Sequence, residues 1–256
     1  MNLEQKIVDF AEYLADEARN IVNSYYRKQF TIENKIDNSP VTEVDQAVEK
    51  VIRKLIDNNF PEHGVIGEEF GPTRENAEFK WVIDPIDGTK SFITGRPIFG
   101  TLIALVHETK PILGIIDQPV LKERWLGANG VTTFNNQKVS TRECRDLGDA
   151  YFATTSPYLF NTGDIARINN ISDRAKSTIY GGDCYSYGQL AMGKLDLVIE
   201  SGLKPYDFCA LVPVIENAGG RVTDWGGNDI NINSNGKILA CGDKKLNEQL
   251  LNNLLA

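Results

Sequence analysis

The 256-residue chain lacks features that mark several common classes of protein. Its four cysteines are widely spaced and none forms a Cys-x-x-Cys pair, so a zinc or redox motif is not expected. No apolar run approaches the length of a membrane span, and the charged N-terminus has no apolar core of signal-peptide length. We therefore expect a soluble, cytoplasmic protein with reduced cysteines and no membrane contact.

Clustered positive charge is also missing. The net charge is −8, with no basic tail and no dense group of Lys and Arg, so nucleic-acid binding is not expected. An acidic enzyme can still act on phosphate esters if bound metal ions reverse the local sign of charge. The hydrophobic content of 41% is enough for a sizeable core, in one large domain or two modest ones.

The first half of the chain predicts two helices on a largely antiparallel sheet. Apolar residues recur at helical spacing over 3–28 and 43–57, and Ser39 or Thr42 can cap the second helix. Strand-like segments punctuated by Gly, Pro and Asn follow at 65–66, 81–83, 99–106, 112–116, 124–127 and 131–134.

The second half alternates between strands and helices. We predict strands at 151–155, 177–180, 195–199 and 237–241, and helices at 162–172, 184–192, 207–218 and 244–255. Such alternation is typical of an α/β layer arrangement. The change of pattern near 140–150 predicts an α+β domain over 1–145 and an α/β domain over 146–256.

The most informative motif is Asp84-Pro85-Ile86-Asp87-Gly88-Thr89, which follows an apolar strand. Pro85 stiffens the backbone between the two aspartates, and Gly88 allows a turn or a close approach of a ligand. Two carboxylates held this close repel each other unless a cation lies between them. Mg²⁺ suits such oxygen ligands. A polar turn that closes a hairpin is the alternative.

Other acidic residues each have a structural explanation when taken alone. Glu68-Glu69 follows Val65-Ile66 and can be a solvated loop. Asp45 is a first-turn acid favoured by the helix dipole, and Asp207 is a helix cap. The two histidines, His63 and His107, lie outside these motifs, and we interpret both as surface or loop residues.

In this order, and with Gly219-Gly220 after them, these motifs resemble the inositol monophosphatase family of the lithium-sensitive, metal-dependent phosphatase superfamily. The resemblance runs from about Asp45 to Gly242. It implies a layered α-β-α-β-α sandwich, an Mg²⁺-dependent phosphomonoesterase with two to three ions, and a homodimer. One departure is Tyr206, where the family usually has Trp; the aromatic character is kept.

The resemblance also implies roles for the acidic residues. Glu68, Asp84 and the carbonyl of Ile86 would hold a first metal ion. Asp84, Asp87 and Asp207 would hold a second, and Glu68 would help to place a third. Most of these ligands lie in the N-terminal domain, with Asp207 in the C-terminal one.

The phosphate and the attacking water would be handled by neighbouring groups. Gly88 and Thr89 would offer backbone N–H groups to the phosphate, and Thr89 also a hydroxyl. Asp45 with Thr89 would orient or deprotonate the water, so Asp45, Thr89 and Glu68 are the expected catalytic residues. Metal ions and positioning, rather than a phosphoenzyme, would provide the acceleration.

Substrate choice should depend on the segment 181–188, which carries an acid, Asp183, at an expected helix start. Inositol-type substrates present only hydroxyls, whereas a substrate with an ammonium group would be stabilised by this charge. A helix cap is the alternative explanation. Glu200, near the end of an expected strand, would hold a hydroxyl or the amine, and Asp207 also lies on the substrate side.

Three segments, 84–97, 181–185 and 201–207, look like the histidinol-phosphate phosphatase branch of the family. The leading substrate is therefore L-histidinol phosphate, a late intermediate of histidine biosynthesis. Inositol 1-phosphate, adenosine 3′,5′-bisphosphate and fructose bisphosphate remain alternatives. A non-catalytic regulator that binds a partner protein is disfavoured, because all the expected metal ligands are present.

Overall fold

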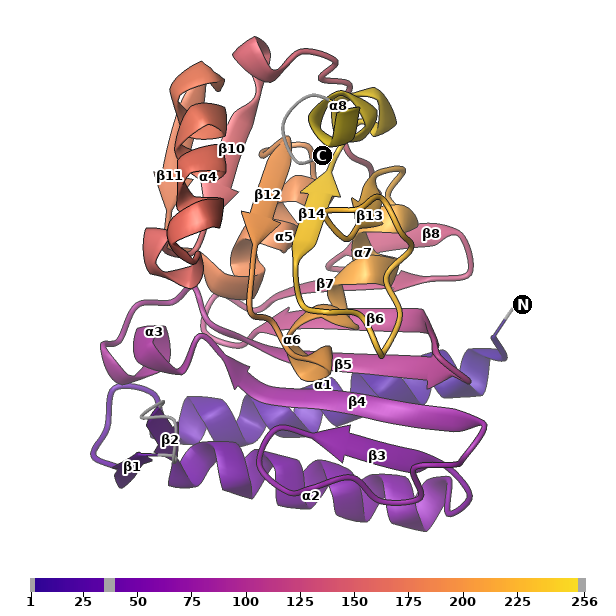
Figure 1. Cartoon of the computed structure of the whole chain (residues 1–256). Coiled ribbons are helices and arrows are strands. Elements are labelled where there is room, and N and C mark those ends of the chain that lie inside the picture. Colours follow the sequence, from indigo (N-terminus) through magenta and orange to yellow (C-terminus); the bar gives the residue numbers. More distant parts are fainter. Residues whose placement is uncertain (1–2, 35–39, 253–256) are drawn as a thin grey trace.

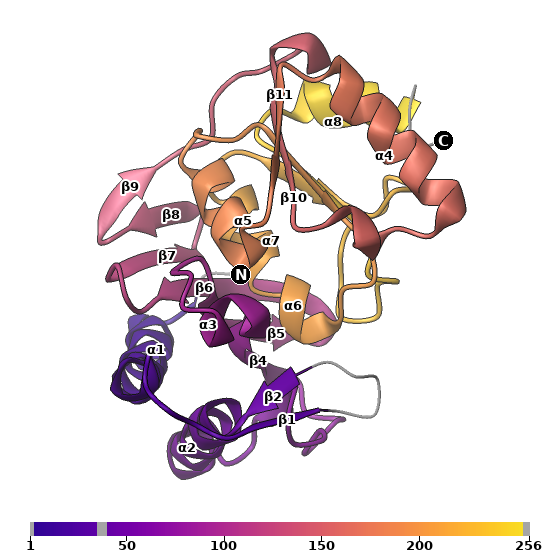
Figure 2. The same ribbon diagram turned by 90° about the vertical axis from the view of Figure 1, so that its left-hand side faces the viewer.

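The computed structural model describes residues 3–34 and 40–252, which form five layers (Figures 1 and 2). Helices α1 (Gln5–Tyr25) and α2 (Glu43–Asn59) cover one face of a seven-stranded sheet. Helices α5, α6 and α7 lie between this sheet and a five-stranded sheet, and α4 and α8 cover the outer face of the second sheet. The α-β-α-β-α sandwich expected from the sequence is confirmed.

The seven-stranded sheet has the order β3-β4-β5-β6-β7-β8-β9, and only β3 and β4 pair in parallel. Its strands are β3 (Gly64–Gly67), β4 (Phe79–Asp87), β5 (Gly100–His107), β6 (Lys110–Gln118), β7 (Glu123–Ala128), β8 (Val131–Phe134) and β9 (Gln137–Val139). A separate antiparallel pair consists of β1 (Ile32–Asn34) and β2 (Pro40–Thr42). The short helix α3 (Thr89–Ile93) follows β4.

The five-stranded sheet has the order β11-β10-β12-β14-β13. Its strands are β10 (Tyr151–Thr154), β11 (Ser177–Tyr180), β12 (Leu197–Glu200), β13 (Arg221–Thr223) and β14 (Ile238–Cys241). The first three are parallel, and β14 runs antiparallel to both of its neighbours. The helices are α4 (Thr162–Arg174), α5 (Asp183–Ala191), α6 (Pro205–Phe208), α7 (Leu211–Glu216) and α8 (Lys244–Leu250), with single 3₁₀ turns at Leu147–Asp149 and Pro157–Leu159.

Both sheets are packed on two faces, which explains why central strands such as β5, β12 and β14 are apolar on both sides. Along β5, Ile103 and Leu105 join the core under α1 and α2, whereas Leu102 and Ala104 join the core shared with the middle helices. This is the period-two alternation of a strand, with apolar residues on both sides. A third core lies between the five-stranded sheet and α4 and α8.

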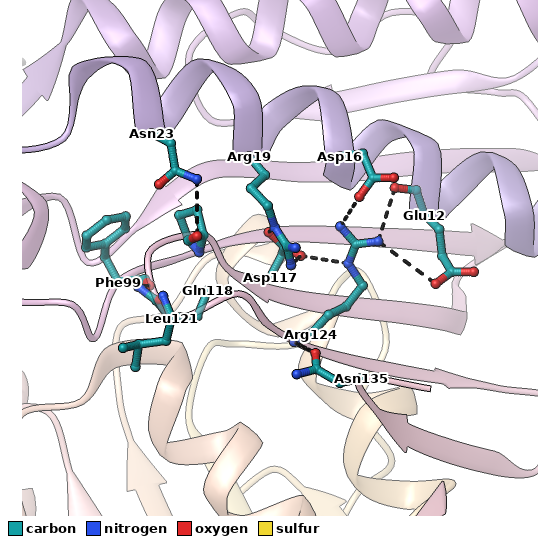
Figure 3. A network of polar contacts seen from close by, with 11 residues as sticks. Glu12, Asp16, Arg19, Asn23, Phe99, Asp117, Gln118, Leu121, Arg124 and Asn135 are labelled. Carbon is teal, nitrogen blue, oxygen red and sulfur yellow. Dashed lines mark hydrogen bonds and ion pairs between the residues drawn. The ribbon is translucent and has the colours of Figure 1, made fainter. Parts of the chain in front are cut away.

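Helix α1 is joined to the first sheet by a network of charged residues centred on the buried Asp117 (Figure 3). Asp117 on β6 is fully buried and accepts hydrogen bonds from Arg19 on α1 at 2.6 and 3.0 Å. Arg124 on β7 also donates to Asp117, at 2.6 Å, and reaches back to Asp16 on α1 at 2.6 Å. A buried carboxylate shared by two guanidinium groups therefore joins three elements.

Most elements lie where the sequence indicates, but one predicted helix is wrong. The segment 207–218 forms two short helices, α6 and α7, instead of one. Pro213 has no N–H, so it cannot donate to the carbonyl of Cys209, and its ring disfavours a continuous helix there. The short strands β1, β2, β9 and β13 were not predicted. Thr42 caps α2 by accepting from the N–H groups of Val44 and Asp45, while Ser39 lies outside the described residues.

All four cysteines are buried and unpaired. Within residues 3–34 and 40–252, no helix is both long and apolar enough to cross a bilayer. The second sheet begins at Tyr151, and the division of the chain into domains at residues 145 and 146 stays a prediction.

Candidate active site

Two aspartates of β4 and a third from a distant part of the sequence meet where α6 packs against β4 and β5. Carboxylate oxygens of Asp84, Asp87 and Asp207 lie within 4.8 Å of one another. Asp84 is only 2% exposed, and the other two are partly buried. In Figure 2, α6 lies over β4 and β5, and α5 lies over β5 and β6.

An irregularity in β4 explains how Asp84 and Asp87 serve one site. Residues three apart in a regular strand point to opposite faces of the sheet. Here Asp84 pairs with Leu102 and Asp87 with Gly100, so two residues of β4 oppose the single residue Thr101 of β5. The extra residue forms a β-bulge, which re-aims the side chains beyond it. Thr101 Oγ1 donates to the carbonyl of Pro85 at 2.8 Å and holds the bulge in place.

A backbone N–H fixes one oxygen of each aspartate. Ile86 donates to Oδ1 of Asp84 at 3.0 Å. The other two aspartates accept from N–H groups at the starts of helices. Cys184, at the start of α5, donates to Oδ2 of Asp87, and Lys204, before α6, donates to Oδ2 of Asp207, each at 2.6 Å. Such donors orient a carboxylate while its second oxygen can face a ligand.

Burial and mutual repulsion make this cluster costly without a cation. Burial, followed by the charges of Glu68 and Asp87, raises the pKa of Asp84 well above the usual range. Burial and then Asp183 do the same for Asp87, and burial raises the pKa of Asp207 to about 7. A set of hard oxygen ligands that repel one another fits a divalent cation such as Mg²⁺.

Glu68 lies near this cluster but outside the tight group of three. It follows β3, which runs parallel to β4 with Gly67 opposite Ile83. Its charge raises the pKa values of Asp84, Asp207 and Asp45. Glu68 therefore lies near enough to Asp84, Asp207 and Asp45 for its charge to act on them.

Asp45 and Thr89, expected to act together on water, have separate partners in this structure. Oδ2 of Asp45 accepts from the N–H of Thr42 at 2.8 Å and from its hydroxyl at 2.5 Å. Its Oδ1 is buried and has no hydrogen-bond partner among the described residues. Burial, partly offset by Thr42, raises the pKa of Asp45 to about 6. Thr89 Oγ1 donates to the carbonyl of Ile86 at 3.2 Å.

Asp183 lies directly against Gly88. A Cβ at Gly88, whose φ is 84°, would stand 2.6 Å from Oδ2 of Asp183, so this close approach requires glycine. Ser91 Oγ, on α3, donates to the same oxygen at 2.7 Å. Burial raises the pKa of Asp183, while Ser91, Arg96 and Lys90 oppose this rise. The acid predicted to select the substrate thus borders the Asp84–Thr89 motif.

Glu200, at the end of β12, is fixed by two donors. Thr155 N–H donates to Oε1 at 3.0 Å, and the Tyr187 hydroxyl donates to Oε2 at 2.9 Å. Glu200 is 4% exposed, and burial raises its pKa. Tyr187 and Ser91 were not singled out in the sequence, because nothing in their local pattern indicates which distant carboxylate they contact.

The histidines take no part in this cluster. His63 is half-buried in a loop, where it stacks on Phe60 and Phe79 and accepts from Trp81 Nε1 at 3.1 Å. It is a packed loop residue, not a surface one. His107 ends β5 and lies 2.9 Å from a carboxylate oxygen of Glu78.

Comparisons with known proteins identify the family of this chain. The family model described as "Inositol monophosphatase family" matches residues 3–255. The chain is 50% identical over 251 residues to the bifunctional phosphatase IMPL2 of Arabidopsis thaliana, covering 94% of this chain and 72% of that protein. It is 33% identical over 231 residues to the histidinol-phosphatase of Chlorobaculum parvum, covering 89% of each chain.

A solved structure gives the same result for the fold. An inositol monophosphatase from Zymomonas mobilis superposes with a TM-score of 0.90 at 44% identity, covering 98% of both chains. The resemblance inferred from the Asp84–Thr89 motif and the acids around it is confirmed. The chain therefore belongs to the inositol monophosphatase family of metal-dependent phosphatases, and it is a phosphoric monoester hydrolase.

Proposed function

We propose that this protein is an Mg²⁺-dependent phosphatase whose preferred substrate is L-histidinol phosphate. The observation that carries the proposal is the partly buried carboxylate of Asp183 against Gly88, held there by Ser91. A carboxylate beside the phosphate-binding turn favours an ester whose alcohol carries a positive charge. Relatives named histidinol-phosphatases support the same assignment.

The metal ligands in this proposal are the clustered acids. Asp84, Asp87 and Asp207 would share one cation, and Glu68 with the Ile86 carbonyl would complete a site for another. We propose two to three ions per site. When bound, Mg²⁺ supplies positive charge that neutralises the phosphate and stabilises the departing alkoxide.

Side chains and backbone groups of the chain itself would bind the phosphate and activate the attacking water. The N–H groups of Gly88 and Thr89, at the start of α3, would bind phosphate oxygens. Asp45 would accept the proton of the attacking water, since its buried Oδ1 is an acceptor without a donor among the described residues. For Thr89 to assist Asp45, its hydroxyl would have to turn away from the Ile86 carbonyl.

Asp183 and Glu200 would receive the organic part of the substrate. Glu200 lies close enough for its charge to affect the pKa of Asp207, and Asp183 affects the pKa of Glu200. An ammonium group between these two carboxylates would be stabilised by both. In our proposal Asp183 makes the main contact, because both oxygens of Glu200 already accept hydrogen bonds.

Inositol 1-phosphate is the second candidate substrate. The Zymomonas mobilis relative, an inositol monophosphatase with high structural similarity, favours it. A neutral polyol could donate hydroxyl hydrogen bonds to Asp183 but would lack the charge attraction that an ammonium group gains there. Relative turnover of the two esters separates these candidates.

We also propose that the protein works as a homodimer in the cytoplasm. Membership of the family supports the dimer, and four buried, unpaired cysteines are consistent with a reducing compartment. Light scattering coupled to size-exclusion chromatography measures the oligomeric state directly. A mass of one chain at working concentration would contradict the dimer.

The experiment that tests the proposed function is a phosphate-release screen on small esters, with Mg²⁺ and with EDTA. The panel contains L-histidinol phosphate, inositol 1-phosphate, fructose bisphosphate and adenosine 3′,5′-bisphosphate. We expect release only with Mg²⁺ and fastest from L-histidinol phosphate. Release from no ester, with either addition, would instead favour a non-catalytic regulator.

A further inference from the structure

Helix α2 carries a row of charged residues toward the interior. Asp45, Glu49 and Arg53 are four residues apart, so they lie along one face of the helix. Asp45 is 1% exposed and Glu49 is fully buried. Charged side chains are almost never buried without specific partners. The burial of Glu49 therefore implies partners that compensate its charge.

The partners of Glu49 are backbone groups of the loop after β3. Its Oε2 accepts from the N–H of Glu69 at 2.8 Å, and its Oε1 accepts from the N–H of Phe70 at 3.1 Å. Arg53 Nε donates to Oε1 at 2.7 Å. The guanidinium of Arg53 also donates to the carbonyls of Phe70 and of Gly71. The two side chains together bind both donors and acceptors of this loop.

These contacts surround one residue, Glu68. The N–H of Glu69 belongs to the peptide bond that follows Glu68, so Glu49 fixes the orientation of that bond. On the other side, a Cβ at Gly67 would lie 2.1 Å from Oε1 of Glu49, so the carboxylate presses against the backbone just before Glu68. Gly67 is itself paired with Ile83 of β4, one residue before Asp84.

We propose that Glu49 and Arg53 are positioning residues that set the metal affinity of the site by holding Glu68 toward the aspartate cluster. This rests on the proposed function, in which Glu68 is a metal ligand. Groups that orient a ligand from behind have measurable effects on metal binding. The competing explanation is a buried ion pair that affects only the stability of the fold.

The test is an Mg²⁺ titration by calorimetry on the full chain, comparing wild type with Glu49→Gln. Glutamine has the size of glutamate but only one acceptor oxygen, so it cannot serve Glu69, Phe70 and Arg53 together. We expect Mg²⁺ to bind about tenfold to a hundredfold more weakly. The rise in Tm on adding Mg²⁺ should shrink in parallel, and the Mg²⁺ concentration needed for half-maximal turnover should increase.

Asp196 provides the matched control. It is fully buried, accepts from the N–H of Tyr151 at 2.8 Å, and receives two donors of Arg142 at 2.5 and 2.7 Å. It precedes β12, whose other end carries Glu200, so it stands away from the acidic cluster. Asp196→Asn should lower the Tm of the metal-free protein yet keep the Mg²⁺ affinity within about twofold of wild type.

Arg53→Lys is a milder second variant, in case Glu49→Gln does not fold. Lysine keeps the charge beside Glu49 but lacks the planar fork that reaches the two carbonyls. We expect its Mg²⁺ affinity to fall by roughly threefold to tenfold.

The outcomes separate this proposal from the proposed function. If Glu49→Gln, or Arg53→Lys where only that variant folds, binds Mg²⁺ as tightly as wild type, the positioning role is overturned and the pair is structural only. If wild type itself binds no Mg²⁺, the metal site of the proposed function fails, and the positioning role fails with it.

Discussion

The backbone N–H of Cys184 donates to Oδ2 of Asp87 across 2.6 Å and thereby joins the start of α5 to the end of β4. The residue before Cys184 is Asp183, which lies against Gly88, the residue after Asp87. The proposed specificity segment and the proposed metal-binding motif are therefore one structural unit. A change that displaces α5 should alter both metal binding and substrate choice.

Gly100 allows α5 to approach this closely. A Cβ at Gly100 would lie 2.8 Å from Cys184 Sγ and 3.1 Å from the carbonyl of Asp117. We expect Gly100→Ala to displace Cys184, weaken its hydrogen bond to Asp87, and lower both Tm and Mg²⁺ affinity. Gly163→Ala is the control, because it sits in α4 with only an asparagine oxygen 3.5 Å from the added carbon. Equal Mg²⁺ affinity in both variants would argue against the role of α5.

Asp87→Asn should raise the stability of the metal-free protein and lower its activity with Mg²⁺. The substitution removes one of several like charges in a buried cluster, so the metal-free protein should gain Tm. The loss of a proposed metal ligand should lower kcat/KM by roughly a hundredfold or more. Thermal melting in EDTA and steady-state kinetics in Mg²⁺ measure the two effects. A metal-free Tm below that of wild type would contradict the repulsion argument.

The stability of the metal-free protein should depend on pH with a definite sign. Burial raises the pKa of Asp45 to about 6 and that of Asp207 to about 7, from an ordinary value of 3.8 in the unfolded chain. Between these values the folded protein binds more protons than the unfolded chain, so its stability falls as pH rises. In EDTA, the contribution of these groups is complete below pH 3.8 and is lost as pH passes about 6 and about 7.

Added Mg²⁺ should reverse this trend, because it binds the ionised carboxylates. The difference in Tm between Mg²⁺ and EDTA should therefore increase from pH 5 to about pH 8. Melting curves in both conditions across this range provide the measurement. A difference that stays constant with pH would show that Mg²⁺ stabilises the protein elsewhere.

Asp183→Asn tests the contact with the substrate amine. Asparagine can still accept from Ser91, so the local fold should persist, while the negative charge is lost. We expect KM for L-histidinol phosphate to rise about tenfold or more, the order expected for a lost charge-assisted hydrogen bond. KM for inositol 1-phosphate should change little. Equal increases for both substrates would count against an amine contact.

Local patterns were sufficient to predict much of the fold and the central motif. The apolar periodicity of α1 and α2 and the apolar strands β4, β5 and β6 follow from regular burial, and Asp84 to Thr89 stands out as acids after a strand. For the other acids, only the resemblance to a family indicated that they belong to one site. The structure brings Asp207 together with Asp84 and Asp87.

What could not be predicted depends on tertiary contacts. The bulge opposite Thr101 decides which face Asp87 serves, and it appears only when β4 pairs with β5. The contact of Asp183 with Gly88 joins residues far apart in sequence. The contacts of Glu49 could not be predicted either, because its partners belong to a loop about twenty residues later.

The most direct measurement is the ratio of kcat/KM for L-histidinol phosphate to that for inositol 1-phosphate, taken with saturating Mg²⁺ on the wild-type protein. A charge-assisted contact to Asp183 predicts a ratio of about ten or more in favour of L-histidinol phosphate. A ratio below one would contradict the assignment of substrate, and it would leave Asp183 as a structural partner of Ser91.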